Sequence, residues 1–178
     1  MLNIFSKKQQ LIFLGVFLIS LTILTYSYLR PTPPQPLEDL SAINPGNTTK
    51  SQLSNLPSYH SKTQGDQELI FFGQNAPKKY SEAIIKNDLV IAYKKTDPST
   101  FEFTNLAAYL SKYGQYQFET NTSFSEFGYS GFVFLKAGIV AVAHLKSQEV
   151  LEEWLIPKDA SLELIESLFP SINQEEGH

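Results

Sequence analysis

The sequence predicts an α+β protein: a mostly antiparallel sheet with two or three packed helices, preceded by one N-terminal transmembrane helix. Three observations predict this class: a charge-free apolar run near the N-terminus, short β-branched and aromatic segments separated by turn residues, and amphipathic segments that begin with helix-capping residues. We expect five parts along the chain: a short cytoplasmic N-terminus (1–10), a transmembrane helix (11–29), a Pro-rich and polar flexible linker (30–66), an α+β globular domain (67–172) and a disordered tail (173–178).

The apolar run over residues 11–29 predicts a membrane anchor. As a helix it would span about 28 Å, close to the roughly 30 Å of a hydrocarbon core. The alternative is a cleaved signal peptide, whose apolar region is about 7–15 residues long and ends at a small-x-small site that this sequence lacks. Lys7 and Lys8 precede the run and only Arg30 closely follows it. The positive-inside rule therefore predicts a single-pass protein with a cytoplasmic N-terminus and the domain outside, and the lipid bilayer as a partner.

The composition excludes several classes of function. A net charge of −4 offers no basic surface for nucleic acid. Because there is no cysteine, disulfides, thiolate zinc sites, cysteine nucleophiles and a lipid-modified cysteine anchor are excluded. His60, His144 and His178 lack the spacing of metal ligands, and no glycine-rich phosphate loop is present. We expect no nucleic acid, metal or cofactor, and nothing in the sequence predicts an oligomeric state.

The segment after the apolar run predicts a spacer. Pro31, Pro33, Pro34 and Pro36 favour extended polyproline geometry and hence a stiff stalk. Residues 37–67 are rich in Ser, Thr, Asn and Gln with scattered Leu and no sustained period. This composition predicts a flexible tether without a core.

The domain begins with two predicted strands around a predicted helix. Apolar runs bounded by turn residues predict strands over 69–72 and 89–93. Between them, the spacing of Tyr80 and Ile84 predicts a short helix over 80–87.

A longer helix is predicted next. Asp97 followed by Pro98 is a typical helix start, and apolar residues then recur at three- and four-residue steps as far as Gly114. The alternative is that the helix begins near Thr104 and that residues 101–103 form a short strand.

The second half of the domain predicts a meander followed by a helix. Strands are expected over 115–120, 132–136, 139–145 and 150–156. A last helix is expected to be capped by Asp159 or Ser161 and to carry apolar residues as far as Phe169. Both faces of residues 139–143 are apolar, which places that strand in the middle of the sheet. Glu152 and Glu153 are neighbours on a strand, so their side chains point to opposite faces. They are expected to be edge-strand charges rather than an acid/base pair.

Few residues suggest catalysis. Gly128-Tyr129-Ser130-Gly131 lacks the second glycine and the strand-to-helix turn of a nucleophile elbow, so Ser130 is not expected to be a nucleophile. His144 shares a strand face with Val140 and Val142 and is expected to be half-buried.

A cluster of aromatic residues is the strongest candidate for a binding surface. Its candidate members are Tyr116, Phe118, Phe124, Phe127 and Tyr129. Most such residues belong to a core, but exposed on one face they could stack on sugar rings or hold a partner protein.

The function predicted from these patterns is a non-catalytic, membrane-anchored extracytoplasmic module that binds an envelope protein or glycan. An anchor, a stalk and a domain are present, whereas the motifs of catalysis are missing. The alternative is a cell-envelope hydrolase with a site assembled around His144, because catalytic triads form from distant positions.

Overall fold

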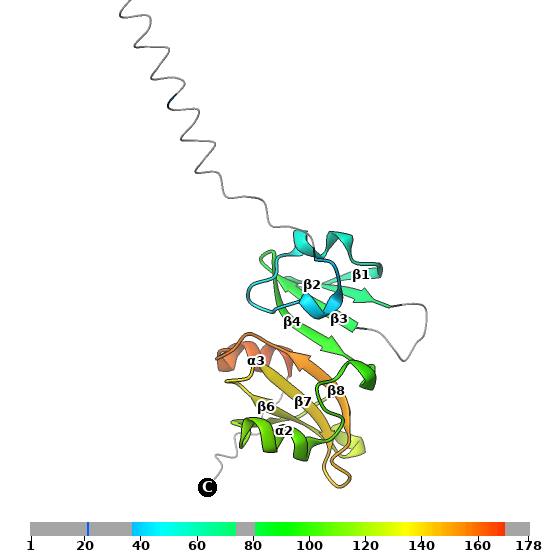
Figure 1. Ribbon diagram of the computed structural model, residues 1–178, viewed down its shortest axis with the longest axis vertical. Coiled ribbons are helices and arrows are strands. Elements are labelled where there is room, and N and C mark those ends of the chain that lie inside the picture. The colour runs from blue at the N-terminus through cyan, green and yellow to red at the C-terminus, as the bar shows by residue number, and fades with distance from the viewer. Residues whose placement is uncertain (1–20, 22–36, 74–80, 170–178) are drawn as a thin grey trace, which may run out of the picture. The chain divides into compact units, whose positions relative to one another are not determined.

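The computed structural model describes residues 21, 37–73 and 81–169 (Figure 1). The chain divides into two compact units, Met1–Pro34 and Gln35–His178. Apart from Leu21, the predicted transmembrane segment lies outside the described residues, as do the predicted N-terminus and tail. In the part that is described, no helix is both long enough and apolar enough to cross a membrane.

The second unit is an α+β fold built on one antiparallel sheet, which confirms the predicted class for this part of the chain. Eight strands are paired in the order β1-β2-β3-β4-β8-β7-β6-β5, and every neighbouring pair is antiparallel. The strands are β1 (Ser58–Gln64), β2 (Gln67–Phe72), β3 (Ser81–Lys86), β4 (Leu89–Lys95), β5 (Phe118–Thr120), β6 (Tyr129–Phe134), β7 (Ile139–His144) and β8 (Val150–Leu155).

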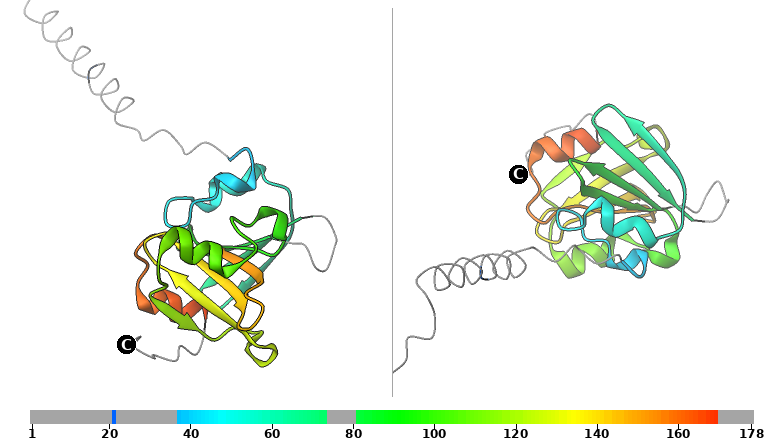
Figure 2. Two further views of the ribbon diagram at one scale, coloured as in Figure 1. Left: turned by 60° about the horizontal axis from the view of Figure 1, so that its bottom comes forward. Right: turned by 90° about the horizontal axis from the view of Figure 1, so that it is seen from above.

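Two α-helices cover opposite faces of this sheet (Figures 1 and 2). The helices are α2 (Leu106–Tyr113) and α3 (Leu162–Leu168), and the 3₁₀ turns are η1 (Leu40–Ala42), η2 (Lys50–Asn55), η3 (Pro98–Thr100) and η4 (Ser125–Phe127). Tyr109 of α2 packs on Phe134, and this side of the sheet is called the α2 face. Ile165 of α3 is buried among Val140 and Trp154 on the other side, the α3 face.

The sheet consists of two halves with the same plan: a helical segment followed by a four-stranded meander. In each half, the residue before the helical segment forms an isolated bridge near the start of the fourth strand, Thr49 with Leu89 and Asn105 with Glu149. Equivalent backbone hydrogen bonds of 2.9 to 3.0 Å flank each bridge. In the first half, Val90 N–H donates to Thr48 C=O and Lys50 N–H donates to Asp88 C=O. In the second half, Val150 N–H donates to Thr104 C=O and Leu106 N–H donates to Gln148 C=O. The registers also shift at equivalent places, after Ile84 in β3 and after Val142 in β7. Residues 49–155 therefore contain an internal structural repeat.

The two halves meet through β4 and β8, which pair over three residue positions only. On the α2 face of this junction, Glu153 is 0% exposed and its Oε1 lies 2.6 Å from Lys95 Nζ. Its other oxygen accepts hydrogen bonds from the Glu102 N–H (2.7 Å) and the Tyr109 hydroxyl. Glu153 thus joins the first half, α2 and the segment before α2, and burial together with this hydrogen bond raises the pKa of Tyr109 above its usual value.

The prediction of a flexible linker over 30–66 is wrong for residues 37–66, which belong to the fold. Ile43, Leu53 and Leu56 are buried in a core on the α2 face, and residues 58–64 form the edge strand β1. The sequence pattern missed this region for a physical reason. Its apolar residues sit in irregular 3₁₀ turns, and β1 is held by backbone pairing with β2 rather than by an alternating apolar face.

The helix predicted over 80–87 is a strand from residue 81 onward. Asn87 and Asp88 both have positive φ angles (51° and 64°) and form a two-residue hairpin turn that returns the chain into β4. Residues of both faces of β3 are buried because it lies inside the sheet. Polar and apolar residues do not alternate along such a strand, so the spacing of its apolar residues resembled that of an amphipathic helix.

The long helix predicted to end at Gly114 begins only at Leu106, with Asn105 as its N-cap. Pro98–Thr100 forms a separate 3₁₀ turn capped by the Asp97 side chain. Between the two, the N–H groups of residues 102 and 103 bind the Glu153 carboxylate and the Tyr109 hydroxyl instead of helix carbonyls. Long-range partners therefore override the local capping signal.

Removing Glu153 should destabilise the protein strongly. Glu153→Ala leaves the Lys95 ammonium without its buried carboxylate and frees two donors, so a loss of about 3–5 kcal/mol in unfolding free energy is expected. Urea unfolding followed by circular dichroism measures it. Glu68→Ala, which breaks the exposed Lys50–Glu68 pair, should cost about 1 kcal/mol or less. Equal losses for the two variants would contradict the central role of Glu153.

A second prediction concerns the packing of β5 on β6. A Cβ added at Gly131 would lie 2.5 Å from Thr120 Oγ1, which is buried and has no hydrogen-bond partner. Gly131→Ala should therefore cost about 1–3 kcal/mol by overpacking. In a Thr120→Ala background the same change should be nearly neutral, and a thermal-unfolding double-mutant cycle tests this. A full loss in both backgrounds would rule out this contact as the cause.

Candidate functional site

The junction of the two halves carries a cavity of about 340 Å³ on the α3 face. The strands contribute Lys94 of β4 with Glu152 and Trp154 of β8. The loop after β5 and the end of α3 supply the rest of the lining: Asn121, Thr122, Ser123, Leu168 and Phe169. This volume lies within the range of small-ligand pockets, about 300–1,000 Å³.

Three ionisable side chains form a group here, of which Lys94 and Glu152 line the cavity. Lys94 Nζ lies 2.7 Å from Glu82 Oε2 and 5.2 Å from the centre of the Trp154 ring. The Trp154 indole N–H donates to Glu152 Oε2 at 3.0 Å. Because the Lys94 side chain is 13% exposed and Glu152 is 9% exposed, these groups interact with little screening by water. Two carboxylates accompany one ammonium, so the fully ionised group carries a net charge of −1.

Burial raises the pKa of Glu152 above its ordinary value of 4.5. The Lys94 charge and the indole hydrogen bond oppose this shift, whereas the Glu82 charge adds to it. The site therefore holds a carboxyl group whose proton is bound more tightly than in water, a property that is common at functional sites.

Local structure fixes the walls of the cavity. The loop after β5 is closed by hydrogen bonds from Thr122 N–H to Ser125 Oγ (2.8 Å) and from Phe124 N–H to Thr122 Oγ1 (3.1 Å). On the opposite wall, the Phe169 ring meets Trp154 edge-on with centroids 4.9 Å apart. The side chains that line the cavity are thus held by strands, a closed loop and a helix end, which favours a pre-formed site.

No family model matches this sequence, and no curated protein matches it. Among solved structures, the chain is similar to the crystal structure of an extracellular protein containing a SCP domain from Bacillus anthracis str. Ames, with a TM-score of 0.47 and 9% identity. The match covers 74% of this chain and 51% of that protein. This chain therefore spans about half the length of that protein, and the likeness is too weak to carry an argument about function.

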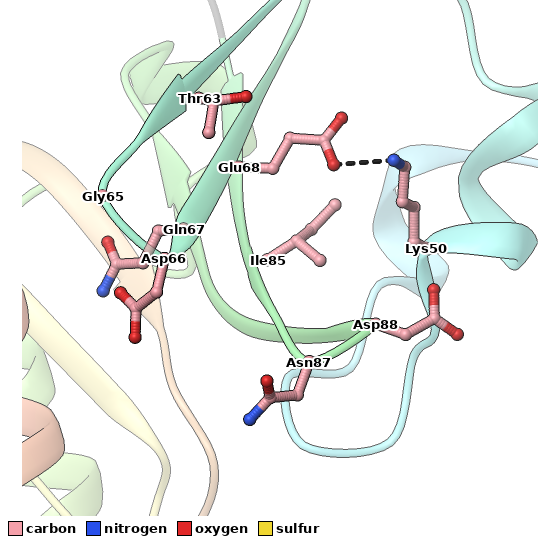
Figure 3. Close-up of a pocket in the computed structure, with 9 residues that line it drawn as sticks. All are labelled: Lys50, Thr63, Gly65, Asp66, Gln67, Glu68, Ile85, Asn87 and Asp88. Atoms are coloured by element: carbon pink, nitrogen blue, oxygen red, sulfur yellow. Dashed lines mark ion pairs between the residues drawn. The ribbon is translucent and has the colours of Figure 1, made fainter.

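A second hollow, of about 380 Å³, lies at the tips of the β1–β2 and β3–β4 hairpins. Figure 3 shows Lys50 and Glu68 pointing toward one another there, with an ion pair of 2.6 Å. Asp66 at the same tip is paired with Lys86 at 2.7 Å. Because the Lys50–Glu68 and Asp66–Lys86 pairs are partly exposed to water, their charges are screened more strongly than those of the junction cavity.

A third hollow, of about 350 Å³, contains Lys112, Lys136 and Lys158. These lysines are exposed, and Lys112 is ion-paired with Glu102. Among the described residues, no group of three His, Asp or Glu side chains could hold a metal ion.

The predicted aromatic surface is divided by the sheet. Tyr116 packs on Phe132 at the α2 face, whereas Phe118 and Tyr129 pack against the core of the α3 face. Phe124 meets Tyr129 edge-on at 6.3 Å. Phe127 is the exposed member, at 70%. The five side chains therefore do not share one face, and a binding role for them stays a prediction.

The two residues considered for catalysis are placed as structural residues. Ser130 is buried in β6. His144 Nδ1 lies 3.3 and 3.1 Å from the backbone N–H groups of Lys146 and Ser147, and 3.2 Å from Ser147 Oγ. These contacts place His144 as a side chain that closes the turn after β7.

Glu152 and Glu153 are not edge charges, because β8 lies in the middle of the sheet. They do point to opposite faces, Glu152 into the junction cavity and Glu153 into the buried network. Sequence reasoning therefore missed Lys94, Glu152 and Trp154 as a group. The available signal was the alternation in β8, where Glu152 and the chain's one tryptophan are two residues apart and share a face.

The Glu152 carboxyl should make stability pH-dependent. A folded-state pKa above the unfolded value means that the folded protein binds the proton more tightly, so the contribution of Glu152 becomes more favourable as the pH falls toward 4.5. Glu152→Gln removes this titration while keeping an acceptor for the indole. Its unfolding free energy should exceed the wild-type value at pH 8, and the difference should shrink with acidification.

Urea titrations at several pH values, followed by Trp154 fluorescence, measure this difference. Glu166→Gln, an equal change at an exposed position of α3, should show no such trend. A difference that grows as the pH falls would show that the pKa of Glu152 is lowered rather than raised.

Proposed function

We propose that this chain is a membrane-anchored binding module that holds an envelope protein or glycan outside the cytoplasm through the junction cavity. The observation that carries the proposal is the cavity itself. It gathers a tryptophan, an ammonium group and a carboxyl with a raised pKa, all on the strands that join the two halves. Partly buried charges beside aromatic walls are costly to maintain in a fold that does not use them.

The remaining support comes from the sequence. The charge-free run over 11–29 is long enough to span a bilayer, and Lys7 and Lys8 before it favour an external domain. A binding role is preferred to hydrolysis because the His144 ring contacts backbone and hydroxyl groups of the turn after β7, and no carboxylate of the described residues hydrogen-bonds to it to orient it as a base. Ligand capture at a pre-formed cavity needs no such arrangement.

The proposal predicts both a topology and a cavity-dependent interaction. A reporter that is active only outside the cytoplasm, fused after His178, should be active. The full chain in lipid nanodiscs should bind envelope fragments of the producing cell, and Ser123→Phe should weaken this binding at least tenfold by filling the cavity. Ser51→Phe, the same change in η2 on the α2 face, should not.

Reporter activity only in the cytoplasm would overturn the predicted location. Equal binding by the wild type and the Ser123→Phe variant would overturn the assignment of the cavity as the binding site. Circular dichroism of both phenylalanine variants checks that neither change unfolds the domain.

A further inference from the structure

The junction cavity has a charge imbalance that points to its ligand. Glu82 and Glu152 both act on Lys94, so among the described residues one ammonium accompanies two carboxylates. At low exposure such an excess negative charge is unfavourable unless a proton or a second cation joins it. The indole N–H of Trp154 donates to one acceptor position of the Glu152 carboxylate. A carboxylate has about four such positions, so it can accept further hydrogen bonds.

The cavity walls suit an organic cation rather than a bare ion. Trp154 and Phe169 provide aromatic surface, and Lys94 already lies over the Trp154 ring as a cation does. Thr122 and Ser123 bring hydroxyl groups to the same cavity. A volume of about 340 Å³ is far larger than a proton or a desolvated metal ion needs. Carboxylate, aromatic and hydroxyl groups together recognise an ammonium group that carries a short carbon chain.

We propose that the junction cavity binds a primary ammonium ligand, with Glu152 accepting hydrogen bonds from the ammonium and the aromatic walls contacting its carbon chain. This inference rests on the proposed binding function and names the chemistry of its ligand. The ammonium belongs either to a free small amine or to an amine-bearing component of the envelope.

The single tryptophan of the chain provides the readout, because Trp154 lines the cavity. The full chain in nanodiscs is titrated with propylammonium and with 1-propanol at pH 8, and Trp154 fluorescence is recorded. Propylammonium should give a saturable change with an affinity at least tenfold above that of propanol. Glu152→Gln should reduce the propylammonium affinity at least tenfold, whereas Glu166→Gln should leave it unchanged.

Two further arms identify the source of the amine and guard against membrane effects. Ser123→Phe should abolish the propylammonium response, which excludes partitioning into lipid as its cause. Envelope fragments are then tested before and after N-acetylation, which removes the positive charge of their amines. Loss of binding after acetylation assigns the ligand to the envelope, and unchanged binding together with a propylammonium response assigns it to a free amine.

The proposal fails if propanol binds within threefold of propylammonium, or if Glu152→Gln leaves the amine affinity unchanged. Binding of envelope fragments that depends on Ser123 but not on charge would retain the binding module and reject the ammonium. If neither fragments nor amine respond to Ser123→Phe, the binding function of the cavity fails as well.

Discussion

The structure depends on the short contact between β4 and β8. Only three residue pairs join the two meanders, as few as join β5 to β6, so backbone pairing alone would hold the two halves together weakly. Side chains reinforce it on both faces. On the α2 face Lys95 and Glu153 form a buried ion pair that also holds α2, and on the α3 face Lys94 packs over Trp154. Because one of these three pairs, Lys94 with Trp154, also lines the cavity, fold stability and the candidate site share residues.

The elements that could be predicted from the sequence are those in which burial within one strand or helix sets the pattern of apolar residues. The meander from residue 132 to 155 and helix α3 follow from apolar runs, turn glycines and capping residues, although β6 begins three residues earlier than predicted. Prediction failed where long-range contacts decide the local structure. Glu153 captures N–H groups that a continuous helix would have used, and β3 has both faces buried because neighbouring strands surround it. The structure of residues 37–64 was missed because irregular turns, and a strand held by backbone pairing, leave no periodic pattern of apolar residues in the sequence.

The candidate site was less predictable than the fold. Its members come from β4, β8, the loop after β5 and the end of α3, and sequence distance gives no sign that these meet. The order of the strands is the missing information, since β8 looked like a final edge strand but inserts beside β4. This position changes the role of Glu152 and Glu153. On an edge strand their charges would only oppose aggregation, whereas in the middle of the sheet each buried carboxylate needs a hydrogen-bond or ion-pair partner.

The repeat explains why such an asymmetric site exists at the centre of a symmetric sheet. By register, Ala92 in one half corresponds to Glu152 in the other, and Lys94 corresponds to Trp154. A sheet assembled from two identical chains would carry the same residue twice at each of these positions, giving two lysines or two tryptophans side by side. Joining both copies in one polypeptide lets each copy acquire its own side chains. Joining the two halves in one polypeptide thus lets an acid, an indole and an ammonium, rather than pairs of identical side chains, meet at the centre of the sheet.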